Sequence, residues 1–379
     1  MEAMRRLQKH LEERPLELQR MKEQGVKVIG YTPGGYMPEE LVYAAGAVPV
    51  GLIRGGSPEP IAESAAYMPR FFDTFCRAQI AYRMSGDDPL YQMVDLLVVP
   101  VTENNIRAIA DSWDFYTNVE TFRFGVPHDK EEDAFDYYLE GLHLLRDKLE
   151  KVTGNKIEDS KLREAIALSN SMWESLEKIS LLRQSPRPPL SGEEFVRLNH
   201  ASFYADKHTL IECLQSLYRE LKGKEGGSPK ARVLLTGSTL AMGDYKILDL
   251  AQRAGAAVVV EEFAEGMRHY WEKTSLNGDL VEALADRYFR RRVPPAWFRP
   301  SRERIDFVMK LAKDFAVDGI IWYQLMYRES YDMQSFYFQR ILEKEMGLRM
   351  LKVASDYDAS EIGPLSTRVE TFIETIKGK

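Results

Sequence analysis

A polar turn follows an apolar segment in the sequence LLVVPVTENNIRAIADSW, residues 96–113. The apolar part, Leu96–Val101, predicts a buried strand, and the residues after Asn105 have the apolar spacing of a helix. Glu103 lies in the turn between the two. A carboxyl group placed there can act as a general acid or base if burial raises its pKa. It can also simply begin the helix, where the helix dipole favours a negative charge, and the residue types alone leave both roles open.

One of the two cysteines is a second candidate for chemistry. Cys76 lies among aromatic residues in FFDTFCRAQ, which is typical of a small buried side chain. Arg77 next to it could instead favour the thiolate, the form that acts as nucleophile and metal ligand. Cys213 falls on the apolar face of a predicted helix, and we assign it to the core. Two cysteines cannot supply a four-thiolate zinc or iron–sulfur site within one chain.

Two adjacent glycines, Gly34 and Gly35, precede a predicted helix in TPGGYMPEE. Backbone amides in such a position can bind a phosphate or another anion, but the sequence favours the other interpretation, an ordinary tight turn. Ser238 and Thr239 in TGSTLAMG leave a similar choice between anion binding and helix capping. Of the six histidines, only His269 falls in a loop that we expect to line a cleft, and even there we favour an exposed histidine or one satisfied within the core.

The elements that must position these residues form two similar α/β patterns. In the first half, Val26–Tyr31, Val48–Ile53 and Leu96–Val99 are predicted strands, and Pro38 is the predicted first residue of a helix. In the second half, the segments ARVLLTG, AVVVEE, DGIIWYQ and LRMLKV are predicted strands with helices between them. In open parallel sheets, ligands bind beyond the carboxyl ends of the strands, where the turns described above lie. The Pro-rich segment RRRVPPAWFRP, residues 290–300, is expected to cover this cleft or to contact a partner.

A helical region separates the two α/β patterns. Three consecutive segments after residue 129 have apolar residues at helical spacing, with Ser160 and Ser191 as predicted N-caps and Gly154 as a predicted C-cap. The segment GKEGGSP is a predicted linker. The predicted domains are an N-terminal helix with the first α/β domain (1–128), a helical domain (129–228) and a second α/β domain (229–379).

Composition narrows the class of protein. The 379 residues carry a net charge of −7, with 44% hydrophobic and 29% charged residues, as in ordinary soluble proteins. The absence of a basic excess argues against a nucleic-acid partner, and no apolar run approaches the ~18 residues that span a bilayer. The charged N-terminal segment is no signal peptide, and two cysteines suit a reducing compartment, so we expect a cytoplasmic protein without membrane contact.

Several of these loops resemble one known family. GYTPGGYMPEELVYAAGAVPVGL is similar to the opening signature of the benzoyl-CoA reductase / 2-hydroxyacyl-CoA dehydratase family, which includes the 2-hydroxyglutaryl-CoA dehydratase D-component. FAEGMRHYW resembles the family's Gly-x-Arg-Tyr loop, and GPLSTRVETFIE its C-terminal box. Among the branches, the short N-terminus and AAGAVPVGL are most similar to the C-type subunit of benzoyl-CoA reductase. The resemblance implies two Rossmann-like or flavodoxin-like parallel-sheet domains plus a helical domain.

The resemblance also implies a cofactor, which this chain matches only in part. In the family, each subunit commonly holds a 4Fe–4S cluster through three cysteines from three loops. The first falls on Cys76, but Glu103 occupies the second position and no cysteine lies near Met326, where the third is expected. Cys76 and Glu103 would be an unusual ligand set, because such clusters prefer thiolates. We therefore expect the cluster on the partner subunit, with an atypical cluster at Cys76 and Glu103 as the alternative.

By this resemblance, the chain is expected to be a subunit of an ATP-activated, low-potential acyl-CoA or aryl-CoA reductase or 2-hydroxyacyl-CoA dehydratase complex. The implied partners are a homologous subunit, in a hetero- or homodimer, an ATP-hydrolysing activator that donates electrons, and the CoA thioester. Glu103 is the candidate catalytic residue. Gly34, Gly35, Arg54 and Arg268 are candidates for binding the anionic CoA, because amides and guanidinium groups suit phosphates. The alternative is a diverged, non-catalytic structural or maturation subunit that pairs with a cluster-bearing homologue.

Overall fold

The first α/β unit is built on a four-stranded parallel sheet. The computed structural model of the chain describes residues 1–376. The strand order is β2-β1-β3-β4, so β1 and β3 are the central strands, and the residues of β1 and of most of β3 are buried. The strands are β1 (Val28–Tyr31), β2 (Val48–Gly51), β3 (Leu96–Val101) and β4 (Glu120–Gly125). The helices are α2 (Glu39–Ala44), α3 (Pro58–Glu63), α4 (Thr74–Ser85), α5 (Pro89–Gln92) and α6 (Asn104–Tyr116), with a 3₁₀ turn at Ser64–Ala66.

The second α/β unit repeats this plan. Its parallel sheet has the order β6-β5-β7-β8, the same arrangement as in the first unit, which confirms the predicted fold class of two parallel-sheet units. The strands are β5 (Ala231–Gly237), β6 (Ala256–Glu262), β7 (Gly319–Leu325) and β8 (Arg349–Ser355). The helices are α11 (Lys246–Arg253), α12 (Met267–Tyr270), α13 (Leu280–Ala285), α14 (Arg302–Asp314), α15 (Glu329–Met346) and α16 (Ile362–Ile376), with a π-helical turn at Asp286–Arg290 and a 3₁₀ turn at Ala359–Glu361.

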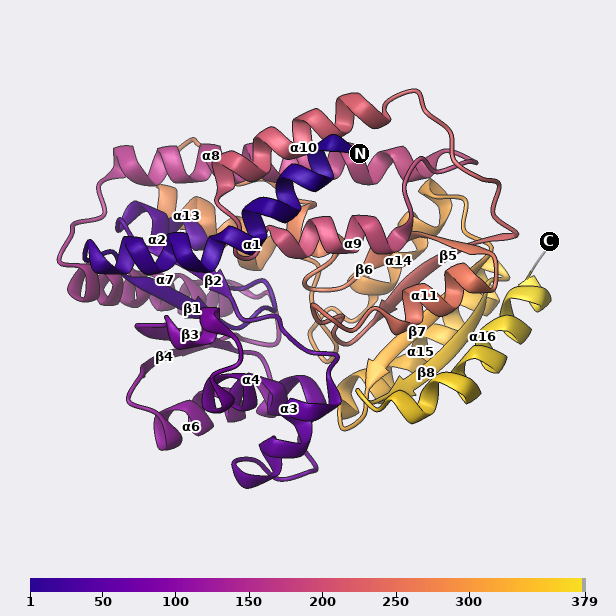
Figure 1. Cartoon of the computed structure of the whole chain (residues 1–379), viewed down its shortest axis with the longest axis horizontal. Helices are drawn as coiled ribbons and strands as arrows, with labels where there is room; N and C mark the ends of the chain where they lie inside the picture. Colours follow the sequence, from indigo (N-terminus) through magenta and orange to yellow (C-terminus); the bar gives the residue numbers. More distant parts are fainter. Residues whose placement is uncertain (377–379) are drawn as a thin grey trace.

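Long helices lie along one side of both units. In Figure 1 they form the upper layer, with the first sheet below them at the left and the second at the right. The N-terminal helix α1 lies beside α10, although the two are almost 200 residues apart in the chain. The helices of this layer and its flank are α1 (Glu2–Glu23), α7 (Glu132–Thr153), α8 (Asp159–Leu181), α9 (Gly192–Ala201) and α10 (Lys207–Leu221), with a 3₁₀ turn at Leu182–Gln184.

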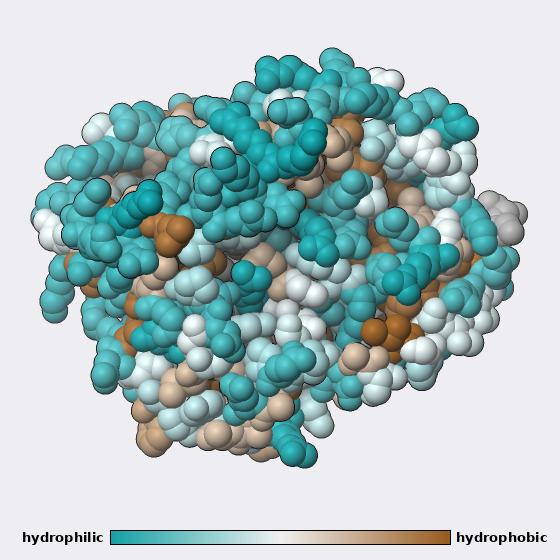
Figure 2. Space-filling view, in the orientation of Figure 1, coloured by the Kyte–Doolittle hydropathy of each residue, from teal (hydrophilic) through white to brown (hydrophobic). Residues whose placement is uncertain are grey.

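The surface of the molecule is mostly hydrophilic in the view of Figure 2, and the upper helical layer is covered by polar and charged side chains. This agrees with the amphipathic patterns of α1 and α10, which bury most of their apolar residues, while most of their charged residues other than Arg14 and Lys207 face solvent. Among residues 1–376, we find no helix with both the length and the apolar character that crossing a membrane requires.

The structure differs from the local predictions in one missed element and two wrong assignments. Strand β4 was not predicted, because as an edge strand it exposes much of its length and carries charged residues. The third predicted helix is two helices, since the chain turns after Ala201 and Asp206 then caps α10 by accepting a hydrogen bond from Thr209. Ser160 lies inside α8, whose N-cap is Glu158, whereas Ser191 does cap α9, in a reciprocal capping box.

The two α/β units meet at the carboxyl edges of their sheets. The segment after β2 pairs with the loop after β5 in a parallel bridge between Arg54 and Met242. Met242 N donates to Ile53 O at 2.8 Å, and Gly55 N donates to Met242 O at 3.0 Å. The loops at the carboxyl edges of the two sheets therefore meet, and this edge is where open parallel sheets bind ligands.

Candidate active site

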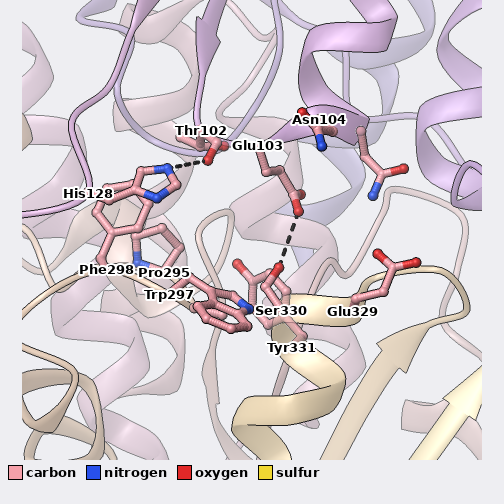
Figure 3. A pocket seen from close by; sticks show the side chains of 12 residues that line it. Thr102, Glu103, Asn104, His128, Pro295, Trp297, Phe298, Glu329, Ser330 and Tyr331 are labelled. Carbon is pink, nitrogen blue, oxygen red and sulfur yellow. Dashed lines mark hydrogen bonds between the residues drawn. The ribbon is translucent and has the colours of Figure 1, made fainter.

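A pocket of about 350 Å³ lies between the two units. In each sheet the strand order reverses between the two central strands, β1 and β3 or β5 and β7, and ligands bind at such reversals. The loop after β3 and the first turn of α15, the helix that follows β7, both reach this pocket, as the labelled residues in Figure 3 show. The lining consists of residues 102–105, His128, residues 295–298 and residues 329–331. The Pro-rich segment thus covers the cleft, one of the two roles predicted for it.

Glu103 directs its carboxyl group into the pocket. It is the N-cap residue of α6 with an extended backbone, yet its side chain makes no capping hydrogen bond. The side chain instead points across the pocket to Ser330, whose Oγ donates to Glu103 Oε2 at 3.4 Å (Figure 3). Glu103 does begin the helix, as one interpretation had it, but its carboxyl group is available to the pocket.

The charge on Glu103 is balanced by Arg328, the residue directly before α15. Arg328 Nη2 lies 2.6 Å from Glu103 Oε1, and Nη1 lies 3.2 Å from Asp73 Oδ2. Burial raises the pKa of Glu103, and the nearby Asp73 charge adds to this, while Arg328 opposes the shift. Burial likewise raises the pKa of Asp73 against the pull of Arg328. The site therefore holds two carboxyl groups and one guanidinium that are largely withdrawn from water.

Cys76 lies next to this ion pair and contacts Asp73. Asp73 is the N-cap of α4 and accepts a hydrogen bond from Cys76 N at 2.7 Å, while Cys76 Sγ donates to Asn105 O at 2.7 Å. Burial raises the pKa of the Cys76 thiol well above its ordinary value, and the nearby cations do not offset this. Arg77 points elsewhere, donating to Ile61 O and Ser64 Oγ. The structure thus places Cys76 close to Glu103, as the family resemblance implies, and Cys76 is the small buried side chain that its aromatic neighbours in the sequence indicated.

The predicted anion-binding residues do not line this pocket. Gly34 and Gly35 have positive φ angles of 142° and 80°. The guanidinium of Arg292 fills the space beside Gly35, and its Nη2 donates to Gly34 O at 3.2 Å. Arg54 is half-exposed and pairs with Asp88 at 2.6 Å. Arg268 is buried and pairs with Glu262 at 2.8 Å. None of the four residues is part of the pocket lining, and both arginines already have a carboxylate partner.

The sequence analysis did not identify two residues of the site, His128 and Arg328. His128, which follows β4, lines the pocket and stacks on Phe298 with 4.4 Å between ring centroids. His269, which we expected to be exposed or part of the core, is buried against Phe203 and outside the pocket lining, and burial lowers its pKa well below the ordinary value. Arg328 was missed as well. The only signal for it was that it is the single cation in LMYRESYD, a loop that follows a central strand.

The donor atoms at the site do not fit a cluster that is held by three thiolates. Cys76 is the one thiol there, and the Glu103 carboxylate is already paired with Arg328. Among residues 1–376, no three histidine, cysteine or acidic side chains are grouped so as to hold a metal ion. A guanidinium at ion-pair distance from the carboxylate would also repel an iron cation that sought the same oxygens.

The chain is similar in sequence to a known protein family and to several named proteins. Residues 35–376 match the family model described as 2-hydroxyglutaryl-CoA dehydratase, D-component. The chain is 27% identical over 362 residues to the putative dehydratase subunit YjiM of Escherichia coli, which covers 94% of this chain and 93% of the relative. It is 23% identical to the (R)-phenyllactyl-CoA dehydratase beta subunit of Clostridium sporogenes, covering 95% and 94%. The C-type subunit of benzoyl-CoA reductase from Thauera aromatica is 22% identical, with 93% and 91% covered.

Proposed function

The chain belongs to the 2-hydroxyglutaryl-CoA dehydratase D-component family, and from this premise we propose that it is a subunit of an acyl-CoA dehydratase or reductase complex. The relatives with names of this kind are similar over nearly their whole lengths. The observation that carries the proposal is the pocket at the joint carboxyl edge of the two sheets, into which Glu103 projects. The family resemblance and the position of the pocket therefore favour the same region as the substrate site.

In this proposal the pocket receives the acyl end of a CoA thioester. Its walls offer the hydroxyl of Ser330, the amide of Asn104 and the aromatic side chains of Trp297 and Phe298, so it can contact both polar and apolar parts of an acyl group. Loss of water from a 2-hydroxyacyl group needs a proton to leave carbon and a proton to reach the departing hydroxyl. Glu103 is suited to exchange such a proton, because burial raises its pKa above the ordinary value of a carboxyl group.

We assign the low-potential electron chemistry to other members of the complex. The donor set around Cys76 and Glu103 does not fit a three-thiolate cluster, so the 4Fe–4S cluster is placed on a homologous partner subunit. An ATP-hydrolysing activator that reduces this cluster completes the proposed assembly. When bound there, the cluster supplies a single electron to the thioester, and the residues of this chain bind and orient the acyl group.

One observation favours a second candidate, a non-catalytic structural or maturation subunit. Glu103 is held in an ion pair with Arg328, and Ser330 also contacts its carboxylate. A carboxylate with both partners can serve to join the two units without ever meeting a substrate. In that case the chain would stabilise a cluster-bearing homologue and bind no acyl-CoA.

The two candidates differ in what Glu103→Gln does to the assembled complex. The catalytic proposal predicts normal assembly and acyl-CoA binding but a kcat lower by about 10²–10⁴-fold, the usual contribution of a positioned acid or base. Glu120→Gln, an exposed carboxylate on β4, is the control and should have the wild-type kcat. A Glu103→Gln complex with the wild-type kcat would favour the structural role. Failure of the chain to co-purify with any homologous subunit would contradict the proposed complex. Failure of the complex to bind an acyl-CoA in calorimetry would contradict the proposed substrate site.

A further inference from the structure

Arg328 connects the two α/β units by its charge. It follows β7 of the second unit, yet both ion-pair partners of its guanidinium, Asp73 and Glu103, belong to the first. Its side chain is 5% exposed and that of Asp73 is fully buried, so water screens this contact only weakly. Two further hydrogen bonds cross the same boundary, from Asn105 Nδ2 to Tyr327 O at 3.1 Å and from Ser330 Oγ to Glu103.

The same place is where the family resemblance locates the cluster ligands. Cys76 at the start of α4, Glu103 before α6 and the loop near Met326 are the three segments, and the structure brings them together. Arg328 is two residues after Met326. Its guanidinium reaches the carboxylate that stands at the second ligand position, and the thiol at the first position donates to the Asn105 carbonyl. The two side chains at the site that could ligate a metal, the Cys76 thiol and the Glu103 carboxylate, thus each already contact another protein group.

We propose that the guanidinium of Arg328 takes the place of an iron–sulfur cluster at this site and clamps the two α/β units together. It provides the positive charge that two buried carboxylates, Asp73 and Glu103, require in a region of low dielectric constant. Without it, the two carboxylates, which both belong to the first unit, would face one another with no counter-charge, and the loop after β7 would lose its ionic contact with that unit. The inference rests on the proposed function only for the identity of the cluster-ligand positions.

The first test is whether the full chain can take up a cluster. The wild-type chain is incubated anaerobically with ferrous iron, sulfide and dithiothreitol, desalted, and analysed for protein-bound iron and sulfide and for visible absorbance. Iron and sulfide below one per chain are expected. Four irons per chain that are lost in Cys76→Ala but kept in Cys213→Ala would overturn the proposal. Iron that is retained equally in both variants lies elsewhere in the chain and supports it.

The second test measures the clamp by hydrogen exchange in the full chain. Arg328→Met leaves two unpaired buried carboxylates, so amide exchange in residues 102–107 and 326–332 should be at least about tenfold faster, with α7 and α8 unchanged. Arg328→Lys keeps the charge and should show a smaller increase. The triple variant Asp73→Asn, Glu103→Gln, Arg328→Met has no charges to balance and should return close to the wild-type rate.

Two results would contradict the clamp. Exchange in Arg328→Met that equals the wild type would show that the guanidinium holds nothing together. Equal acceleration in Arg328→Met and in the triple variant would show that lost packing, and not unbalanced charge, opens the site. Neither test uses a partner subunit or a CoA thioester, so their outcome is independent of the test of the proposed function.

Discussion

The buried His200 should make the fold sensitive to acid. His200 lies in α9 with 1% of its surface exposed, stacks on Tyr245 and places Nδ1 3.1 Å from the Tyr245 hydroxyl. Burial, aided by the charge of Arg197, lowers its pKa from 6.5 to about 3. The unfolded chain therefore binds a proton at a pH where the native chain does not. Stability from this group is fully present above pH 6.5 and is lost as the pH falls towards 3.

The size of the effect follows from the two pKa values. Each pH unit between 6.5 and 3 removes about 1.4 kcal/mol, so the loss from His200 is roughly 2 kcal/mol at pH 5 and about 5 kcal/mol at pH 3. His200→Phe keeps an aromatic ring but cannot be protonated. The lost hydrogen bond to Tyr245 lowers its stability at every pH alike, so this cost cancels when two pH values are compared.

Urea unfolding at pH 7 and pH 5, followed by circular dichroism, measures the difference. The free energy of unfolding should fall by about 2 kcal/mol more in the wild type than in His200→Phe. His143→Gln, at an exposed position on α7, serves as the control and should behave as the wild type does. Equal losses in the wild type and in His200→Phe, to within about 0.5 kcal/mol, would refute the reasoning that the native state holds this ring neutral.

Two further predictions concern local structure, each measured as the free energy of unfolding in urea. Gly35→Ala should cost more than about 2 kcal/mol, because its φ is 80° and the added Cβ would meet the Arg292 guanidinium. Gly154→Ala, with a similar φ but open space around it, should cost about 1 kcal/mol. Equal costs would exclude the steric explanation. Ser191→Ala should cost about 1 kcal/mol through the lost capping box, whereas Ser160→Ala inside α8 should be nearly neutral, and the reverse order would show that the caps are wrongly assigned.

The sequence predicted most elements because their signals are local. Apolar runs bounded by glycine and polar residues gave β1, β2, β3 and all four strands of the second unit, and helical spacing gave α1, α7 and α8. Strand β4 lacked that signal because an edge strand need not be apolar. The break between α9 and α10 was hidden, because apolar spacing continues through it even though Asp206 is a good N-cap.

The candidate site was predictable only in part. The rule that ligands bind at the carboxyl ends of parallel strands led to the turn at Glu103, which does line the pocket. The same rule also led to Gly34, Arg54 and Arg268, which have other contacts, because a loop's position in the sheet does not determine where its side chains point. His128 follows an edge strand that had not been predicted, so nothing in its neighbourhood marked it.

The sequence by itself determined the fold class of two parallel-sheet units. It also determined which reactive side chains are present: a carboxylate in the turn after β3, and a single cysteine where the resemblance expects three. Only the tertiary structure decided what these groups do to one another. Arg328 and Asp73 are 255 residues apart, and no periodicity or local propensity connects them. Their contact exists because the two sheets meet at their carboxyl edges, where the buried carboxylates of the first unit need a counter-charge and Arg328 of the second unit supplies it.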